Sequence, residues 1–138
     1  MTGKKAVFKC HKISEGKASG EVLFSKDGIC FYLIDPKTGV VIQRNHCLVG
    51  KSIAGKVLGF PNGTGSSVVQ ADGMYQLKMN HNEPKAMIVK NADTTLVASS
   101  IIMDMPLVDK VEKGFEKEVK NKDIVEVDAS LGKISLLG

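Results

Sequence analysis

Short apolar segments separated by turn-forming residues fill the first third of the chain. The turns are marked by Asp27-Gly28 and by residues 35–39, Asp-Pro-Lys-Thr-Gly, in which proline presets one φ angle and glycine tolerates a positive one. Apolar and β-branched residues between such turns are typical of half-buried strands. The pattern predicts consecutive antiparallel strands at residues 6–10, 21–24, 29–33 and 40–42.

The middle of the chain changes to an alternation of buried strands and helices. Residues 57–60, Val-Leu-Gly-Phe, and residues 86–89, Ala-Met-Ile-Val, each predict a fully buried strand. Between them, Val69, Gly73 and Leu77 recur at four-residue spacing, which indicates one apolar face of a helix.

Polar residues suggest where the helices of this region begin. Ser67 is followed three residues later by Gln70, which has the form of a capping box and predicts a helix start at Ser67. Asp93 is a good N-cap for a second helix that reaches Ile102, and a short strand is expected at 107–108. The strand–helix–strand–helix–strand order favours right-handed crossovers and a small parallel sheet.

The last part of the chain returns to strands. Residues 113–120 predict a short charged helix or surface turn, and residues 123–128 and 133–136 predict a hairpin. The expected fold is therefore α/β, with layers of sheet, sheet and helix. Antiparallel strands from both ends of the chain surround a small parallel βαβαβ sheet, and residues 1–138 form a single domain.

Composition narrows the class of protein. A chain of 138 residues, 43% hydrophobic and 25% charged, is typical of one soluble domain. No apolar run is long enough for a membrane helix and the N-terminus lacks the apolar block of a signal peptide, so we expect a cytoplasmic protein without a membrane partner. The net charge of +4 comes from dispersed lysines, Arg44 is the only arginine, and aromatics are 5%, so nucleic acid is not an expected partner.

The three cysteines do not suggest a metal centre within this chain. Cys10, Cys30 and Cys47 lack a Cys-x-x-Cys pair, and their spacing fits neither a zinc site nor an iron–sulfur site. Two of them adjoin histidines, as Cys10-His11 and His46-Cys47, so a Cys/His site assembled by the fold is conceivable. Buried thiols are the simpler interpretation, and we expect no metal to be held by this chain alone.

The segment between the first buried strand and the first helix is the strongest candidate site. Residues 61–67 read Pro-Asn-Gly-Thr-Gly-Ser-Ser and include Gly63, Gly65, Ser66 and Ser67. A glycine-rich loop before a helix N-terminus presents backbone N–H groups and a partial positive charge, which favour an anion or a developing oxyanion. This loop is therefore a candidate anion or active site.

A long irregular loop at residues 44–56 supplies further polar candidates, since long loops are often functional. Arg44, Lys51 and Ser52 are candidates for holding a carboxylate or phosphate. The simpler interpretation is that each is a solvated residue of the loop. His46 either orients a substrate or closes a turn.

Several short motifs occur together in an order that resembles a known family, the small subunit of aconitase X. They are Gly16, Gly20-Glu21-Val22-Leu23, residues 35–39, His46, residues 50–56, residues 63–67, Pro84-Lys85-Ala86 and Met105-Pro106-Leu107-Val108. The family includes small subunits of archaeal phosphomevalonate dehydratases and the matching domain of bacterial cis-3-hydroxyproline dehydratases. The resemblance implies the three-layer β/β/α swivelling domain of the aconitase superfamily, a hydro-lyase activity on a hydroxy acid, and a large subunit that holds an iron–sulfur cluster.

The resemblance also implies a role for Ser66. Gly65-Ser66-Ser67 is similar to the aconitase-type Gly-Ser-Ser, whose first serine removes the substrate proton. A serine acts as a base only where N–H donors stabilise its alkoxide, and a glycine loop at a helix N-terminus supplies such donors. The capping box independently assigns Ser67 to structure and leaves Ser66 available for chemistry, whereas without the resemblance both serines would be interpreted as caps.

The chain departs from the aconitase pattern after the two serines. Aconitase has a substrate-binding arginine there, whereas this chain has Val68. The helix start at residues 68–73 also differs from that of the phosphomevalonate and hydroxyproline enzymes. The sequence therefore leaves the substrate and the residues that hold its charged groups open.

Two other functions deserve comparison with the hydro-lyase. A P-loop needs Lys-Ser or Lys-Thr after its second glycine, and no lysine occurs between Lys56 and Lys78, which argues against nucleotide binding. The second alternative is a non-catalytic module whose glycine loop binds an anion or a protein.

Overall fold

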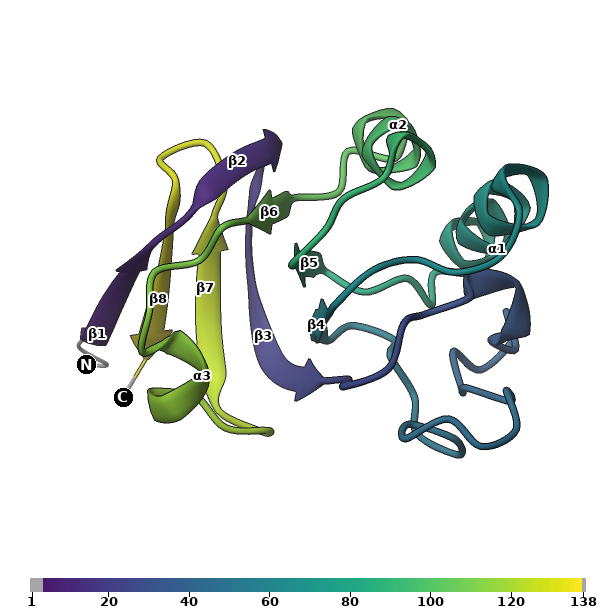
Figure 1. Ribbon diagram of the computed structural model, residues 1–138, viewed down its shortest axis with the longest axis horizontal. Helices are drawn as coiled ribbons and strands as arrows, with labels where there is room; N and C mark the ends of the chain where they lie inside the picture. The colour runs from purple at the N-terminus through teal and green to yellow at the C-terminus, as the bar shows by residue number, and fades with distance from the viewer. Residues whose placement is uncertain (1–3, 138) are drawn as a thin grey trace.

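The computed structural model describes residues 4–137, which form a strongly curved sheet, one face of which is covered by the two longest helices (Figure 1). Among these residues, no helix has the length and apolar character of a membrane span. The strands are β1 Lys4–Lys9, β2 His11–Ser14, β3 Lys17–Phe24, β4 Val57–Phe60, β5 Ala86–Val89, β6 Leu107–Asp109, β7 Ile124–Asp128 and β8 Lys133–Leu137. The helices are η1 Phe31–Leu33, a 3₁₀ turn, α1 Ser67–Met79, α2 Thr94–Ile102 and α3 Phe115–Glu118.

The strand order explains the curvature. The order across the sheet is β1-β8-β7-β3-β4-β5-β6-β2, so β1 and β2 lie at opposite ends although only Cys10 separates them in the chain. The sheet therefore folds back on itself until its two edges meet at Cys10. β3 is shared by both halves, because residues 17–21 pair antiparallel with β7 and residues 22–24 pair parallel with β4.

Three layers result, as expected. Along β5, Ala86 and Ile88 point into a core between the two halves of the sheet, whereas Met87 and Val89 point into a second core beneath α1 and α2. A strand with apolar residues on both faces must be covered on both, and the second half-sheet and the helices provide the two covers. The expected β/β/α arrangement is confirmed.

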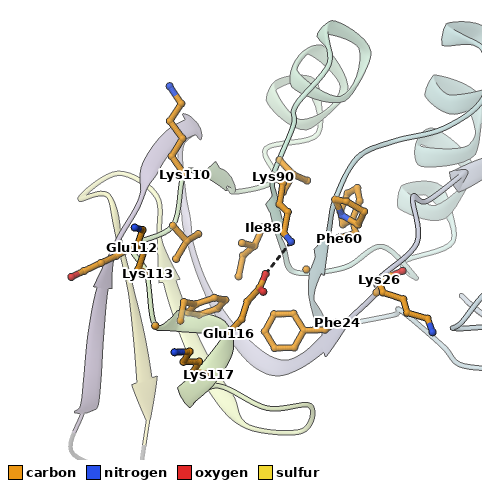
Figure 2. A pocket seen from close by; sticks show the side chains of 17 residues that line it. Phe24, Lys26, Phe60, Ile88, Lys90, Lys110, Glu112, Lys113, Glu116 and Lys117 are labelled. Atoms are coloured by element: carbon orange, nitrogen blue, oxygen red, sulfur yellow. Dashed lines mark ion pairs between the residues drawn. The ribbon is translucent and has the colours of Figure 1, made fainter.

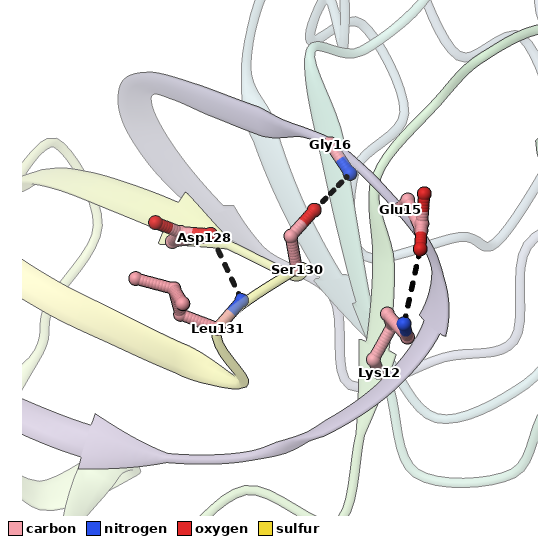
Figure 3. Close-up of polar contacts among 6 residues, drawn as sticks. All are labelled: Lys12, Glu15, Gly16, Asp128, Ser130 and Leu131. Atoms are coloured by element: carbon pink, nitrogen blue, oxygen red, sulfur yellow. Dashed lines mark hydrogen bonds and ion pairs between the residues drawn. The ribbon is translucent and has the colours of Figure 1, made fainter.

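Most local elements of the second half of the chain lie where the sequence places them. Asp93 is the N-cap of α2, since its Oδ1 accepts from Leu96 N at 2.8 Å. The hairpin of β7 and β8 is also present. Figure 3 shows how its turn is fixed: Asp128 Oδ1 accepts from Leu131 N at 3.1 Å, and Ser130 Oγ accepts from Gly16 N at 3.3 Å, which ties the hairpin to the β2–β3 turn.

The first half of the chain contains the errors. The strands expected at 29–33 and 40–42 are wrong: Phe31–Leu33 is a 3₁₀ turn, and the rest makes only isolated bridges such as Ile29 with Gly63 and Val40 with Ser52. The expected series of consecutive antiparallel strands is also wrong, because β1, β2 and β3 each pair with strands far away in the sequence. Local pattern does not encode those distant partners.

Candidate active site

The glycine loop lies at the carboxyl edge of the parallel strands, between the end of β4 and the start of α1. Its backbone pairs with the segment that follows Gly28: Ile29 N donates to Asn62 O at 3.0 Å, and Thr64 N donates to Ile29 O at 2.9 Å. Ligands of open α/β sheets bind beyond this edge of the strands. The loop is thus held by hydrogen bonds in a position suited to a site.

Two glycines are required by the geometry of the loop. A Cβ on Gly63 would lie 2.6 Å from Gln70 Nε2 and 3.1 Å from Asp93 Oδ2, so a side chain there would displace both. Gly65 has a φ of +96°, a left-handed conformation that favours glycine. Both predicted residues therefore shape the loop.

The capping assignment of the two serines is off by one residue. Ser66, not Ser67, is the N-cap of α1, and its Oγ accepts from Val69 N at a long 3.5 Å. Ser67 is the first helical residue, and its exposed hydroxyl makes no hydrogen bond with residues 4–137. The capping box fails because the side chain of Gln70 turns into the core and does not reach back to Ser67.

As the N-cap of α1, Ser66 still lies where its hydroxyl can react. Its hydroxyl is exposed at the N-terminus of a 13-residue helix. The first N–H groups of a helix have no intrahelical acceptor, and together with the helix dipole they stabilise negative charge beside them. An alkoxide at Ser66, or an anionic group of a ligand beside it, would meet these donors.

Gln70 is a site residue that the sequence analysis did not single out for this role. Its side chain is 3% exposed; Oε1 accepts from Phe31 N at 2.8 Å and Nε2 donates to Ile29 O at 3.0 Å. The available signal was its position one turn before Gly73 and Met74, because residues three and four apart lie on the same face of a helix. The amide group holds residues 29–31 against the start of α1.

His46 is buried and closes a turn of the long loop. Its Nε2 lies 2.9 Å from Gly28 O, and its Nδ1 accepts from Leu48 N at 3.0 Å, which makes Nε2 the protonated nitrogen. The contact to Gly28 is next to the residues that pair with the glycine loop. Of the two interpretations of His46, the geometry favours turn closure.

Asp27 strengthens the same turn. Its Oδ2 accepts from Cys47 N at 2.9 Å, and this hydrogen bond, followed by one from the Cys47 thiol, holds the pKa of Asp27 below its ordinary value. Asp27, His46 and Cys47 bring one potential metal-ligand atom each within 4.8 Å of one another. Both nitrogens of His46 are already engaged, so this group is a hydrogen-bonded clamp.

Among residues 4–137, no hydrogen bond or ion pair joins the other loop candidates to the two serines. Ser52 is used within its own loop, donating to Thr38 O at 3.1 Å and accepting from Ala54 N at 3.2 Å. Arg44 and Lys51 are exposed, and neither side chain makes an ion pair or hydrogen bond within residues 4–137. These two cations stay candidates for anion binding.

The cysteines do not fit an iron–sulfur cluster. Such a cluster requires several thiolates at one point. In the described part of the chain, the only group of three or more potential ligands contains Cys47 as its single cysteine. Cys30 lies beneath Gly65, whose Cβ would be 3.2 Å from its sulfur, and Cys10 lies where the sheet edges meet. The three thiols occupy separate environments.

The protein is thus a three-layer β/β/α domain with a serine-containing glycine loop at the start of α1. The sequence model of one family, the aconitase X swivel domain, matches residues 7–136. The chain belongs to this family.

Named relatives agree with this assignment. The chain is 46% identical over 126 residues to the phosphomevalonate dehydratase small subunit of Methanosarcina acetivorans, covering 91% of this chain and 87% of that one. The corresponding protein of Methanosarcina mazei is 47% identical over 131 residues, with 94% and 90% covered.

Solved structures show the same fold. The crystal structure of Thermococcus kodakaraensis aconitase X, holo-form, superposes with a TM-score of 0.86 at 40% identity, covering 96% of this chain and 99% of that chain. A UPF0107 protein solved by solution NMR gives 0.85 at 35% identity, with 96% and 100% covered.

Proposed function

We propose that this chain is the small subunit of a two-subunit phosphomevalonate dehydratase, and that residues 1–138 form one swivelling domain that completes the active site. The observation that carries the proposal is the position of Ser66, which lies exposed at the N-terminus of α1 within a glycine loop. Identities of 42–47% to five small subunits of phosphomevalonate dehydratases, over about nine-tenths of the chain, support the choice of substrate over other hydroxy acids.

In this proposal Ser66 is the general base. Dehydration transfers a proton from one carbon atom to Ser66 Oγ, the electron pair of the broken C–H bond forms the double bond, and the hydroxyl group leaves from the neighbouring carbon. The N–H groups of the first turn of α1 and the helix dipole lower the free energy of the serine alkoxide. Gly63 and Gly65 allow the loop to bring these donors close to the substrate.

The chemistry of an iron–sulfur cluster would come from the large subunit. The cysteines of this chain lie in separate environments and do not fit such a cluster, so no step of the reaction is assigned to a metal held here. The isolated chain should be colourless and inactive. A visible absorption band from a cluster bound to the isolated chain, or turnover without the large subunit, would contradict this division of roles.

The experiment is a rate measurement on the complex reconstituted with its large subunit, with phosphomevalonate as substrate. Ser66→Ala should lower the rate by about 10²–10⁴-fold, since this is the usual contribution of a positioned base. Its loss of stability should stay below about 1 kcal/mol, because the capping bond it removes is long at 3.5 Å.

Ser67→Ala is the matched control. It removes a neighbouring hydroxyl that makes no hydrogen bond with the described residues, so stability and most of the rate should be retained. An active Ser66→Ala complex would exclude Ser66 as the base, and activity of both variants would indicate a non-catalytic domain. A complex of unaltered subunits that dehydrates hydroxyproline but not phosphomevalonate would exclude the substrate.

A further inference from the structure

A cleft of about 870 Å³ lies at the same carboxyl edge of the parallel strands as the glycine loop (Figure 2). We call it the α3 cleft, defined by residues 24–26, 59–61, 88–90 and 110–117. It is therefore formed by the carboxyl ends of β3, β4 and β5 and by the segment that carries α3. Pro61 lines it, whereas Gly63, Gly65, Ser66 and Ser67 do not. The cleft is a feature separate from the proposed base, and its interpretation does not depend on the proposed function.

The inner wall of the α3 cleft is apolar and rigid. Phe24 and Phe115 meet edge to face with ring centroids 5.8 Å apart. Phe115 and Ile88, 3% and 6% exposed, belong to the core between the two halves of the sheet, and that core supports this wall. Phe60, 4% exposed, instead packs against Phe31 in the core beneath the helices. The volume of the cleft, about 870 Å³, suits a small organic molecule, because pockets for such ligands usually measure 300–1,000 Å³.

The rim of the α3 cleft is cationic. Two glutamates face five lysines in its lining: Lys26, Lys90, Lys110, Lys113 and Lys117. Both glutamates already have partners, since Glu112 Oε1 accepts from Lys9 N at 2.8 Å and Glu116 Oε1 lies 3.5 Å from Lys90 Nζ. The surplus of cations favours a ligand with more than one negative charge.

Lys90 is the cation that reaches over the cleft. Figure 2 shows Lys90 and Glu116 pointing toward one another across it, whereas the amino groups of Lys26 and Lys110 point away. The pair is exposed, at 67% and 65%, and pairs of this kind contribute little free energy. An incoming anion can therefore replace Glu116 on Lys90 at small cost.

We infer that the α3 cleft binds an amphiphilic phosphate monoester, with its apolar group against Phe24 and Phe115 and its phosphate on Lys90. The apolar wall accounts for the organic part and the lysine rim for the dianionic head group. Lysine binds phosphate as a point charge on a flexible stem, so the other rim lysines can turn toward the ligand after Lys90 engages it.

The first experiment measures the affinity of the full chain for ethyl, butyl and hexyl phosphate by calorimetry, with inorganic phosphate and hexanol as references. Each methylene group that is buried should tighten binding by about fourfold. Hexyl phosphate should therefore bind much more tightly than ethyl phosphate, and the neutral alcohol should bind weakly. Equal affinities for hexyl phosphate and inorganic phosphate would overturn the inference, as would an absence of binding.

Two substitutions at the exposed ion pair give effects of opposite sign. Lys90→Gln should weaken hexyl phosphate binding by about three- to fivefold, and Glu116→Gln should tighten it by a similar factor because Lys90 loses its competitor. Lys12 and Glu15 form another exposed pair, at 3.1 Å, outside the cleft (Figure 3). Lys12→Gln and Glu15→Gln are thus matched controls that should leave the affinity unchanged. Equal effects of the two sets would indicate non-specific charge binding and contradict the inference.

The location is tested separately by NMR. Hexyl phosphate should shift the amide signals of Val89, Lys90 and Phe115, and shifts confined to residues 63–67 would overturn the assignment to the α3 cleft. The same titration on the complex decides between a ligand and a protein occupant. Binding should persist in the complex, whereas its loss on addition of the large subunit would show that the cleft is a subunit contact instead.

Discussion

The side-chain amide of Gln70 makes hydrogen bonds to the backbone of Ile29 and Phe31 of the kind that a neighbouring strand would make. Its Oε1 accepts from Phe31 N at 2.8 Å while its Nε2 donates to Ile29 O at 3.0 Å, so one buried side chain satisfies the backbone of two residues. Ile29 in turn pairs with both Asn62 and Thr64 of the glycine loop. The helix start, the 3₁₀ turn and the loop are therefore one hydrogen-bonded unit around Ser66.

Gln70→Met should destabilise this unit. The substitution roughly keeps the side-chain volume but leaves Phe31 N–H without an acceptor, whereas Ile29 C=O keeps the hydrogen bond from Thr64 N. An unsatisfied buried group costs about 1–3 kcal/mol. We expect a loss of about 1–3 kcal/mol in denaturant unfolding and faster hydrogen exchange at Phe31 N.

Gln76→Met is the control for this change. Gln76 lies on the exposed face of the same helix, and the substitution should alter stability by less than about 0.5 kcal/mol. Equal effects at the two positions would contradict the role given to Gln70.

The same unit shows what the sequence could and could not predict. The strands and helices from β4 to β6 were predictable because each has its own apolar pattern, and the N-cap of α2 was predictable because Asp93 lies directly before that helix. Gln70 was misassigned because the capping-box pattern is local too, whereas the donors and acceptors that its side chain binds are about 40 residues earlier in the chain. The shared role of β3 was not predictable either, since its partner β7 lies more than 100 residues away.

Gly73→Ala tests the packing between α1 and η1. A Cβ at this position would lie 2.4 Å from Phe31 C and 2.4 Å from Tyr32 N, which are backbone atoms that cannot turn aside. Alanine gains about 1 kcal/mol in helix propensity. The displacement of the 3₁₀ turn should exceed this gain, and we expect a net loss of about 1–2 kcal/mol, measured by thermal unfolding.

The control for Gly73→Ala is Ala71→Gly, at an exposed position of the same helix. It measures propensity without a change in packing and should cost about 1 kcal/mol. If propensity decided both positions, Gly73→Ala would raise the melting temperature, and the close contact with Phe31 would have no energetic importance.

Cys10 is only partly buried, yet its thiol should react more slowly than that of an ordinary cysteine. Burial, and then the carboxylates of Asp109 and Asp128, raise the pKa of Cys10 to about 11. The thiolate fraction at pH 8 is then roughly two orders of magnitude below that of an ordinary cysteine. Alkylation of Cys10 by iodoacetamide, followed by mass spectrometry of the peptide, should be slow at pH 8 and should accelerate up to about pH 11. A rate that levels off near pH 8.5 would disagree with this environment.

The clamp between Asp27 and Cys47 should persist in acid. The hydrogen bond from Cys47 N, together with the thiol of Cys47, lowers the pKa of Asp27, because both donors stabilise the carboxylate. A carboxyl group with a depressed pKa in the folded state contributes stability above its unfolded pKa, and that contribution is lost as the pH falls through the folded value.

The amide proton of Cys47 reports directly on its hydrogen bond to Asp27 in an NMR titration. Its chemical shift should change with a midpoint below about 3.9, the ordinary value of an aspartate. Asp27→Asn retains an acceptor without a titrating group, so the same signal should lose this transition. A midpoint at or above the ordinary value, or an unchanged transition in Asp27→Asn, would mean that Asp27 does not hold the turn that places His46 against Gly28.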